Sequence, residues 1–191
     1  MKVRLSSALV LPFFIILGFV VYLPSLSAPF FFDDYEFVTN NPLARNAAVL
    51  FSQWPSAGLK FITYLTFVGN FIVGGEAPFG YHLLSIILHI FNAWLLSILA
   101  GKLLQTPQSE KHFNSQQKAM IPLMAALLFL VHPVASSAVS YIWQRAELLT
   151  AAFYLSALIF YVLGRQEKKI VYTIAAAVCF VVGLFAKGTI L

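Results

Sequence analysis

The chain has 191 residues, of which 60% are hydrophobic and only 10% are charged, and its formal net charge is +5. This composition excludes a soluble domain, which does not need so much apolar surface, and predicts a protein that spans a membrane several times. In such a protein Lys and Arg report orientation, so the positive charge does not indicate a nucleic-acid partner. The single cysteine excludes an intrachain disulfide.

The first apolar segment, residues 5–23, is long enough to cross about 30 Å of hydrocarbon at about 1.5 Å per residue. Ser25-Leu26-Ser27 follows it and resembles the small-residue cleavage site of a secretory signal peptide. However, the apolar stretch is longer than that of most signal peptides, and further spans follow. We therefore predict a retained first helix.

Residues 24–80 form a long outer loop, and its stretch 30–36 carries three of the chain's seven acids, namely Asp33, Asp34 and Glu36. Adjacent carboxylates repel each other, so placing them beside a membrane costs free energy unless something compensates. Acidic pairs in such places typically serve as a base, a metal site or the partner of a cation. A solvated loop that happens to begin with acids is the alternative, and the residues of this loop alone do not decide between the two.

Within this loop, residues 59–75 are apolar but carry polar side chains at spacings of three and four. These are Lys60, Thr63, Thr66 and Asn70, which share one helical face. The pattern predicts a helix that lies in the membrane interface. If the segment instead crossed the membrane, the basic loops downstream would face outside, against the positive-inside rule.

The second span is predicted at residues 81–104. His82, Ser85, His89 and Asn92 form one polar stripe along it. Interhelical hydrogen bonding is the simpler interpretation, and we favour it for Ser85 and Asn92, whereas the two histidines also fit a wet cavity. Because seven residues of helix separate the histidines by about 10 Å, we predict no metal site.

Three further spans are predicted near residues 119–140, 146–164 and 170–186. His132-Pro133 interrupts the first of them and leaves two alternatives. Either the helix kinks and continues toward Ser140, or it breaks and the segment up to Gln144 lies at the outer surface.

This topology places most of the basic residues on one side of the membrane. Eight of the 12 lie inside: Lys2, Arg4, Lys102, Lys111, Lys118, Arg165, Lys168 and Lys169. The positive-inside rule therefore predicts a cytoplasmic N-terminus. The fold class expected is all-α, a polytopic membrane helical bundle with about five spans and an interfacial helix in the first outer loop.

The outer ends of separate helices then deliver ionisable and polar groups to one membrane face. The set is Asp33, Asp34, His82, His132, Gln144, Arg145, Glu147 and Lys187. Carboxylates can take a proton from a nucleophile, and Arg, Lys and His can hold a phosphate leaving group. The combination predicts group transfer from a phosphate-bearing donor. Since the sequence has no nucleotide-binding motif, a donor carried on a lipid phosphate fits best.

The motifs along the chain resemble those of the GT-C superfamily of membrane glycosyltransferases. They are Phe32-Asp33-Asp34-Tyr35, Leu65-Thr66-Phe67, Gly80-Tyr81-His82, His89-Ile90-Phe91-Asn92-Ala93, His132-Pro133-Val134, Gln144-Arg145-Ala146-Glu147-Leu148-Leu149 and Ala186-Lys187. The likeness is closest to the protein O-mannosyltransferases that often carry C-terminal tetratricopeptide repeats, the cadherin-targeting transmembrane type and its bacterial relatives. It extends through essentially all of the chain.

This resemblance implies an enzyme that moves a mannose-like sugar from a polyprenyl-phosphate donor to a protein or glycan hydroxyl, with inversion. By the resemblance, Asp33 is the general base and Asp34 supports it, although the residues alone do not distinguish the two. His132, Arg145 and Lys187 would hold the donor phosphate. The resemblance assigns His82 to the same cavity as a weaker candidate, and Gln144 and Glu147 are further cavity-lining candidates. The pattern does not indicate a divalent metal.

The chain also departs from that family. Lys60-Phe61 stands where Arg-Pro is usual, and the family has roughly twice as many spans, so we expect the N-terminal part of a larger module. Two other functions remain: a non-catalytic lipid-binding or assembly protein, including an inactive truncated copy, and a transporter or channel. The transporter ranks last because the charges sit at span ends. The expected location is a bacterial inner membrane.

Overall fold

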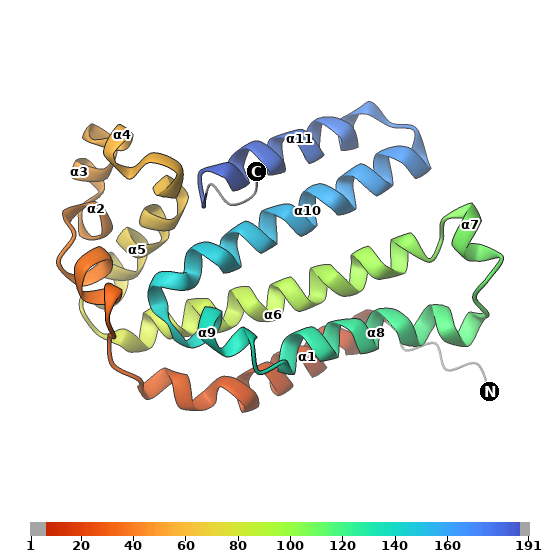
Figure 1. Ribbon diagram of the computed structural model, residues 1–191, viewed down its shortest axis with the longest axis horizontal. Helices are drawn as coiled ribbons and strands as arrows, with labels where there is room; N and C mark the ends of the chain where they lie inside the picture. The colour runs from red at the N-terminus through yellow and green to blue at the C-terminus, as the bar shows by residue number, and fades with distance from the viewer. Residues whose placement is uncertain (1–6, 188–191) are drawn as a thin grey trace.

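The computed structural model describes residues 7–187, which form helices and turns with no β-strand among them. The long helices lie side by side (Figure 1). They are α1 (Ser7–Tyr22), α6 (Pro78–Leu103), α8 (Ser115–Val131), α10 (Arg145–Glu167) and α11 (Ile170–Leu184). Helix α6 is central and contacts α1, α8 and α10, whereas α11 packs on α10. The prediction of an all-α bundle is confirmed.

Three helical stretches are long and apolar enough to cross a membrane: Trp54–Gly74, Pro78–Leu103 and Ile142–Glu167. Three shorter apolar helices accompany them, at Leu11–Ser27, Ser115–Val131 and Ile170–Leu184. The chain is therefore a helical, multi-pass membrane protein. The number of spans and the sidedness stay predictions. Residues 5 and 6 of the first predicted span, like Lys2 and Arg4, lie outside the described residues.

Close packing of the first helix depends on a glycine. A Cβ atom at Gly18 would lie 2.5 Å from Cγ1 of Ile90, so only a residue without a side chain lets α1 approach α6 this closely. Small residues serve the same purpose where helices cross within membranes, because the hydrophobic effect does not drive helix association there.

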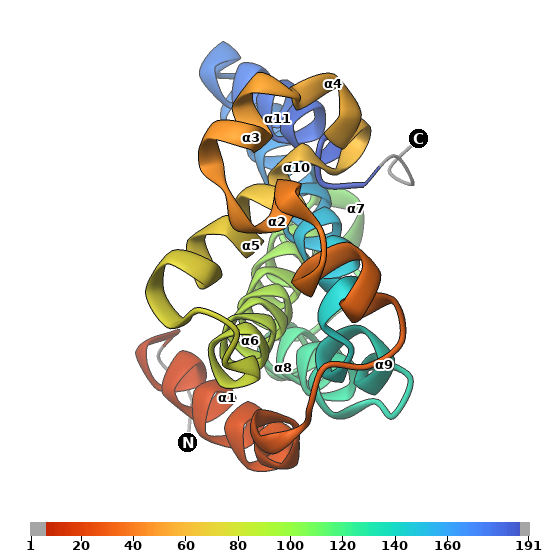
Figure 2. The ribbon, with the colours of Figure 1, turned by 90° about the vertical axis from the view of Figure 1, so that its left-hand side faces the viewer.

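The loop between α1 and α6 folds into a cap over one end of the bundle, seen end-on in Figure 2. It consists of η1 (Leu23–Ser27), η2 (Tyr35–Thr39), α2 (Pro42–Arg45), α3 (Ala47–Ser52), α4 (Trp54–Ala57), η3 (Gly58–Lys60) and α5 (Phe61–Gly74). Helix α5 runs across the direction of the long helices in this view. That direction agrees with an interfacial helix, which stays a prediction because α5 also belongs to a stretch long enough to span.

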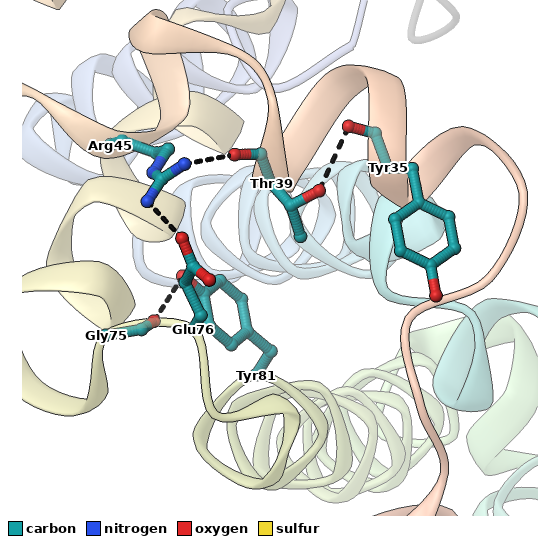
Figure 3. Close-up of polar contacts among 6 residues, drawn as sticks. All are labelled: Tyr35, Thr39, Arg45, Gly75, Glu76 and Tyr81. Carbon is teal, nitrogen blue, oxygen red and sulfur yellow. Dashed lines mark hydrogen bonds and ion pairs between the residues drawn. The ribbon is translucent and has the colours of Figure 1, made fainter.

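Polar contacts tie the cap to the turn between α5 and α6 (Figure 3). The Arg45 guanidinium donates to the Thr39 carbonyl at 2.6 Å and pairs with the Glu76 carboxylate. The Tyr81 hydroxyl donates to the Gly75 carbonyl at 3.1 Å. These bonds link η2 and α2 to the start of α6, so the segment that follows the acid pair has a defined position.

The predicted span at 119–140 breaks after α8 and does not kink and continue, whereas the outer-surface location of the segment up to Gln144 stays a prediction. Helix α8 ends at Val131, and His132 adopts an extended backbone with φ −66° and ψ 128°. Pro133 explains the break, because it disfavours helical geometry at the preceding residue and has no N–H to continue the ladder. The short helix α9 (Ala135–Ser140) and the turn η4 (Ile142–Gln144) then lead into α10.

The break leaves the Leu130 carbonyl without its helical donor, since the Val134 N–H bonds the His132 ring at Nδ1 instead (3.2 Å). Two side chains from other helices replace that donor. The Tyr22 hydroxyl and the His89 Nε2 each donate to the Leu130 carbonyl at 3.1 Å. His89 therefore caps α8 and joins α1, α6 and α8.

Of the other residues in the polar stripe on α6, Asn92 forms an interhelical hydrogen bond and Ser85 does not. Asn92 donates from Nδ2 to the Leu148 carbonyl at 2.9 Å, so the prediction of interhelical bonding is confirmed for this residue. The Ser85 hydroxyl is buried and has no hydrogen-bond partner within residues 7–187, so the same prediction is not supported for Ser85.

We expect the two donors to Leu130 to substitute for each other. Replacing His89→Leu alone or Tyr22→Phe alone should lower the free energy of unfolding by about 1 kcal/mol, the scale of an interhelical bond in a membrane. The double variant should cost more than the sum, because it leaves a buried carbonyl unpaired. Thermal unfolding in detergent measures the three variants, and strict additivity would contradict this account.

Candidate active site

The acid pair lies in a short loop between η1 and η2. Its entry is anchored by Phe30, whose buried ring packs edge-on against Tyr81 with 5.3 Å between centroids. At Phe32 the backbone adopts a positive φ of 44°, which an L-residue rarely tolerates outside tight turns. The chain reverses there and sends Asp33 and Asp34 into different environments: Asp33 is exposed, whereas Asp34 is only 1% exposed.

Asp34 binds the backbone on both of its carboxylate oxygens. Oδ2 accepts the N–H of Phe31 at 3.0 Å, and Oδ1 accepts the N–H of Trp143 at 2.7 Å. Burial raises the pKa of the Asp34 carboxyl above its usual range, while these N–H groups oppose that rise. Asp34 therefore fastens the acidic loop to the turn that precedes α10.

Asp33 keeps its carboxylate at the surface. Its backbone N–H donates to the Tyr141 hydroxyl at 3.1 Å. Burial raises the pKa of that hydroxyl, and the nearby charge of Asp33 raises it as well. Of the two acids, only Asp33 has a side chain that a bound molecule can reach without displacing backbone bonds.

Two lysines lie near this loop. The Lys60 ammonium stands over the Trp143 ring, 4.3 Å from its centroid, and the charges of Asp33 and Lys187 both act on it. The second lysine, Lys187, forms an ion pair with Glu147 at the start of α10. Both members of this pair are partly exposed.

Backbone bonds hold the end of the described chain against the start of α5. The Ile62 N–H donates to the Phe185 carbonyl, and the Thr63 hydroxyl donates to the Ala186 carbonyl, both at 2.8 Å. Lys187 follows directly, so its place beside Lys60 is set by two hydrogen bonds between segments that are far apart in the sequence.

Arg145, a predicted phosphate ligand, is completely buried. Its guanidinium donates to Asn70 Oδ1 at 2.6 Å, to Thr66 Oγ1 at 3.2 Å and to the Tyr81 carbonyl at 2.9 Å. It also lies over the Phe67 ring at 4.6 Å. Arg145 thus joins α5, α6 and α10, and within residues 7–187 it forms no ion pair.

The remaining predicted residues are dispersed around this end of the bundle. His132 is exposed and accepts a hydrogen bond within its own turn. His82 is buried and donates from Nε2 to the Ala28 carbonyl at 3.1 Å, just before the acidic loop. Gln144 is half-buried in η4. The predicted residues therefore fall into three groups: Asp33 and Asp34 share the acidic loop, Glu147 pairs with Lys187, and His82 and Arg145 lie in the interior.

Three residues at the site were not among the predicted ones: Lys60, Tyr141 and Trp143. Lys60 had a signal, since it lies on the polar face of the predicted interfacial helix. The sequence gives no signal for Tyr141 or Trp143, because a single aromatic residue before a helix is common in membrane proteins. Within residues 7–187 no group of three or more His, Cys, Asp and Glu side chains is arranged to hold a metal ion.

Comparison with known proteins identifies relatives along most of the chain. Protein O-mannosyl-transferase Tmtc1 of Drosophila melanogaster is 32% identical over 177 residues, which are 84% of this chain and 19% of that protein. Protein O-mannosyl-transferase F38B6.6 of Caenorhabditis elegans is 34% identical over 163 residues, 78% of this chain and 22% of that protein. Human protein O-mannosyl-transferase TMTC4 is 29% identical over 167 residues, which are 78% of this chain and 22% of that protein.

The chain spans about a fifth of the length of these relatives. No family model matches the chain, and no solved structure matches it. All three relatives are animal proteins, so the expectation of a bacterial inner membrane receives no support. Identity at this level over four-fifths of the chain makes it a homologue of the N-terminal region of the TMTC protein O-mannosyl-transferases.

Proposed function

We propose that this chain carries the catalytic end of an inverting glycosyltransferase. It moves a mannose-like sugar from a polyprenyl-phosphate donor to a hydroxyl of a protein or glycan, on the non-cytoplasmic face of the membrane. The single observation that carries the proposal is the exposed Asp33 carboxylate, whose charge acts on the nearby Lys60 ammonium. The names of the relatives, all protein O-mannosyl-transferases, support the reaction class.

In this mechanism Asp33 accepts the proton of the acceptor hydroxyl as that oxygen bonds to the anomeric carbon. The bond from that carbon to the phosphate oxygen breaks on the opposite face, which inverts the configuration. The electron pair leaves with the polyprenyl phosphate, and nearby cations stabilise the developing charge. Lys187 and Lys60 occupy suitable positions for this role.

The other residues predicted to act in the site have supporting roles. Asp34 positions the loop, since both of its oxygens already accept backbone N–H groups. Arg145 reaches a phosphate only if it exchanges its bonds to Asn70 and Thr66 for bonds to the ligand. His132 is exposed and free of that constraint.

A non-catalytic membrane protein with a role in assembly is the second candidate function. One observation favours it: the ion pair with Glu147 already compensates the charge of Lys187 without a donor. Such a protein tolerates the loss of the Asp33 carboxylate, whereas the transferase does not.

The donor site is tested by binding of a fluorescent polyprenyl phosphate to the whole chain in lipid nanodiscs. Lys187→Ala should weaken binding about tenfold, the value of one lost charge-assisted contact worth about 1.4 kcal/mol. Lys169→Ala is the matched control, since Lys169 also pairs with a glutamate, Glu167, but at the opposite end of α10. Equal affinities for both variants would contradict the assignment of Lys187.

A further inference from the structure

A groove opens directly beside the acidic loop. It has a volume of about 430 Å³ and lies between α9 and the segment that follows η1. Seven described residues line it: Ala28, Pro29, Phe31, Ser136, Ser137, Ser140 and Tyr141. This volume falls in the range of pockets that bind small ligands or a few residues of a peptide. None of the residues predicted to act in the site lines the groove.

The groove adjoins the exposed acid but not the cations. Tyr141 belongs to its wall, and the hydroxyl of Tyr141 accepts the backbone N–H of Asp33. The two lysines lie instead near Trp143 and the end of α11. Because none of the seven described lining residues is charged, the groove suits a neutral ligand better than a lipid phosphate.

The serine hydroxyls in the wall are set to accept hydrogen bonds. Ser136 Oγ donates its proton to the Pro133 carbonyl at 2.6 Å, and Ser137 Oγ donates to the Val134 carbonyl at 3.1 Å. A hydroxyl that has donated its only proton can still accept with its lone pairs. The wall therefore favours a ligand that presents N–H donors, as the backbone of an extended polypeptide does.

The remaining wall is apolar. Ala28, Pro29 and Phe31 contribute it, next to the ring of Tyr141. An extended peptide presents its side chains alternately to two sides, so one side can contact such an apolar wall while the backbone bonds the polar wall. A lipid chain would leave the serine acceptors unpaired, which favours the peptide.

We propose that this groove binds the acceptor as an extended, neutral segment of polypeptide and places a Ser or Thr hydroxyl at Asp33. The inference rests on the proposed function, because it needs Asp33 as the base. It divides the site in two: the acceptor enters between α9 and the segment after η1, and the donor phosphate lies on the side of Trp143, Lys60 and Lys187. The acidic loop separates the two parts.

The test is photo-crosslinking of a threonine-containing peptide with a benzophenone group to the whole chain in nanodiscs, followed by mapping of the label. We expect labels within residues 28–31 and 134–141. Ser137→Leu and Ala28→Leu narrow the groove from opposite walls, and each should reduce labelling at least tenfold. Ser52→Leu is the matched control, since Ser52 is an exposed serine outside the groove with the same bond to the carbonyl three residues earlier.

Labels on the wild-type chain that map outside the groove would overturn the proposal, and this outcome needs no variant to fold. So would labelling that persists in both narrowed variants, or a photoreactive lipid that labels the groove in place of the peptide. Sugar transfer separates this inference from the proposed function. If the peptide labels the groove but no sugar is transferred, the transferase function is contradicted and peptide binding in the groove is supported. If sugar is transferred and the KM for the peptide is unchanged in both variants, the transferase function is supported and the groove is not the acceptor site.

Discussion

Replacing Asp33→Asn is expected to lower the rate of sugar transfer by a factor of about 10² to 10⁴, the usual contribution of a general base. Asparagine keeps the shape of the side chain but cannot accept the proton of the acceptor hydroxyl. Because the Asp33 side chain is exposed and the bond from its backbone N–H to the Tyr141 hydroxyl does not depend on the carboxylate, the fold should not change. The measurement is transfer of radiolabelled mannose from dolichyl-phosphate mannose to a threonine peptide.

The control for this experiment is Glu36→Gln, which neutralises another exposed acid just beyond the pair. It should leave transfer within about twofold, since general-base catalysis depends on contact with the reacting group and not on loop charge. Full activity in Asp33→Asn would contradict the role of this carboxylate. Equal losses in both variants would mean that the loop acts through its charge alone.

Replacing Asp34→Ala is expected to destabilise the protein by about 2 to 4 kcal/mol. The carboxylate satisfies two backbone N–H groups: leaving the buried N–H of Trp143 unpaired costs about 1 to 3 kcal/mol, and losing the partly buried bond to Phe31 adds about 1 kcal/mol. The loss should be largest around the acidic loop and the turn η4. Thermal unfolding in detergent gives the total effect, and hydrogen exchange of residues 28–40 locates it.

Asp34→Asn separates hydrogen bonding from charge. Its one carbonyl oxygen can accept only one of the two N–H groups, so we expect about half the loss seen with alanine. If Asp34→Ala is as stable as wild type yet inactive, Asp34 contacts the substrate and does not position the loop. That result would reverse the roles proposed for the two acids.

The sequence positions of the two acids did not predict that one is exposed and the other buried. Asp33 and Asp34 are neighbours with the same chemistry, and the sequence left their roles to a family resemblance. What separates them is the Trp143 N–H, 109 residues further along the chain, which bonds Asp34 and draws it into the interior. Long-range contacts of this kind have no local signal.

The environment of Arg145 was also not predictable from the sequence. Its charge at a helix start predicted a phosphate ligand, yet Asn70, Thr66 and Tyr81 enclose it. Thr66 and Asn70 had been recognised as one polar face of a helix, and the structure shows that this face turns toward Arg145. The pattern was correct, but its partner could not be inferred from spacing.

The sequence by itself determined the features that depend on neighbouring residues and on composition. Apolar content predicted a helical membrane protein, His132-Pro133 marked the point where the span at 119–140 either kinks or breaks, and the motif order indicated the homologous family. The tertiary structure alone decided which side chains are exposed, which charges act on Lys60, and where a groove opens beside Asp33. The physical reason is that local signals act within a few residues, whereas burial and site geometry arise from contacts between segments that only the packed helices bring together.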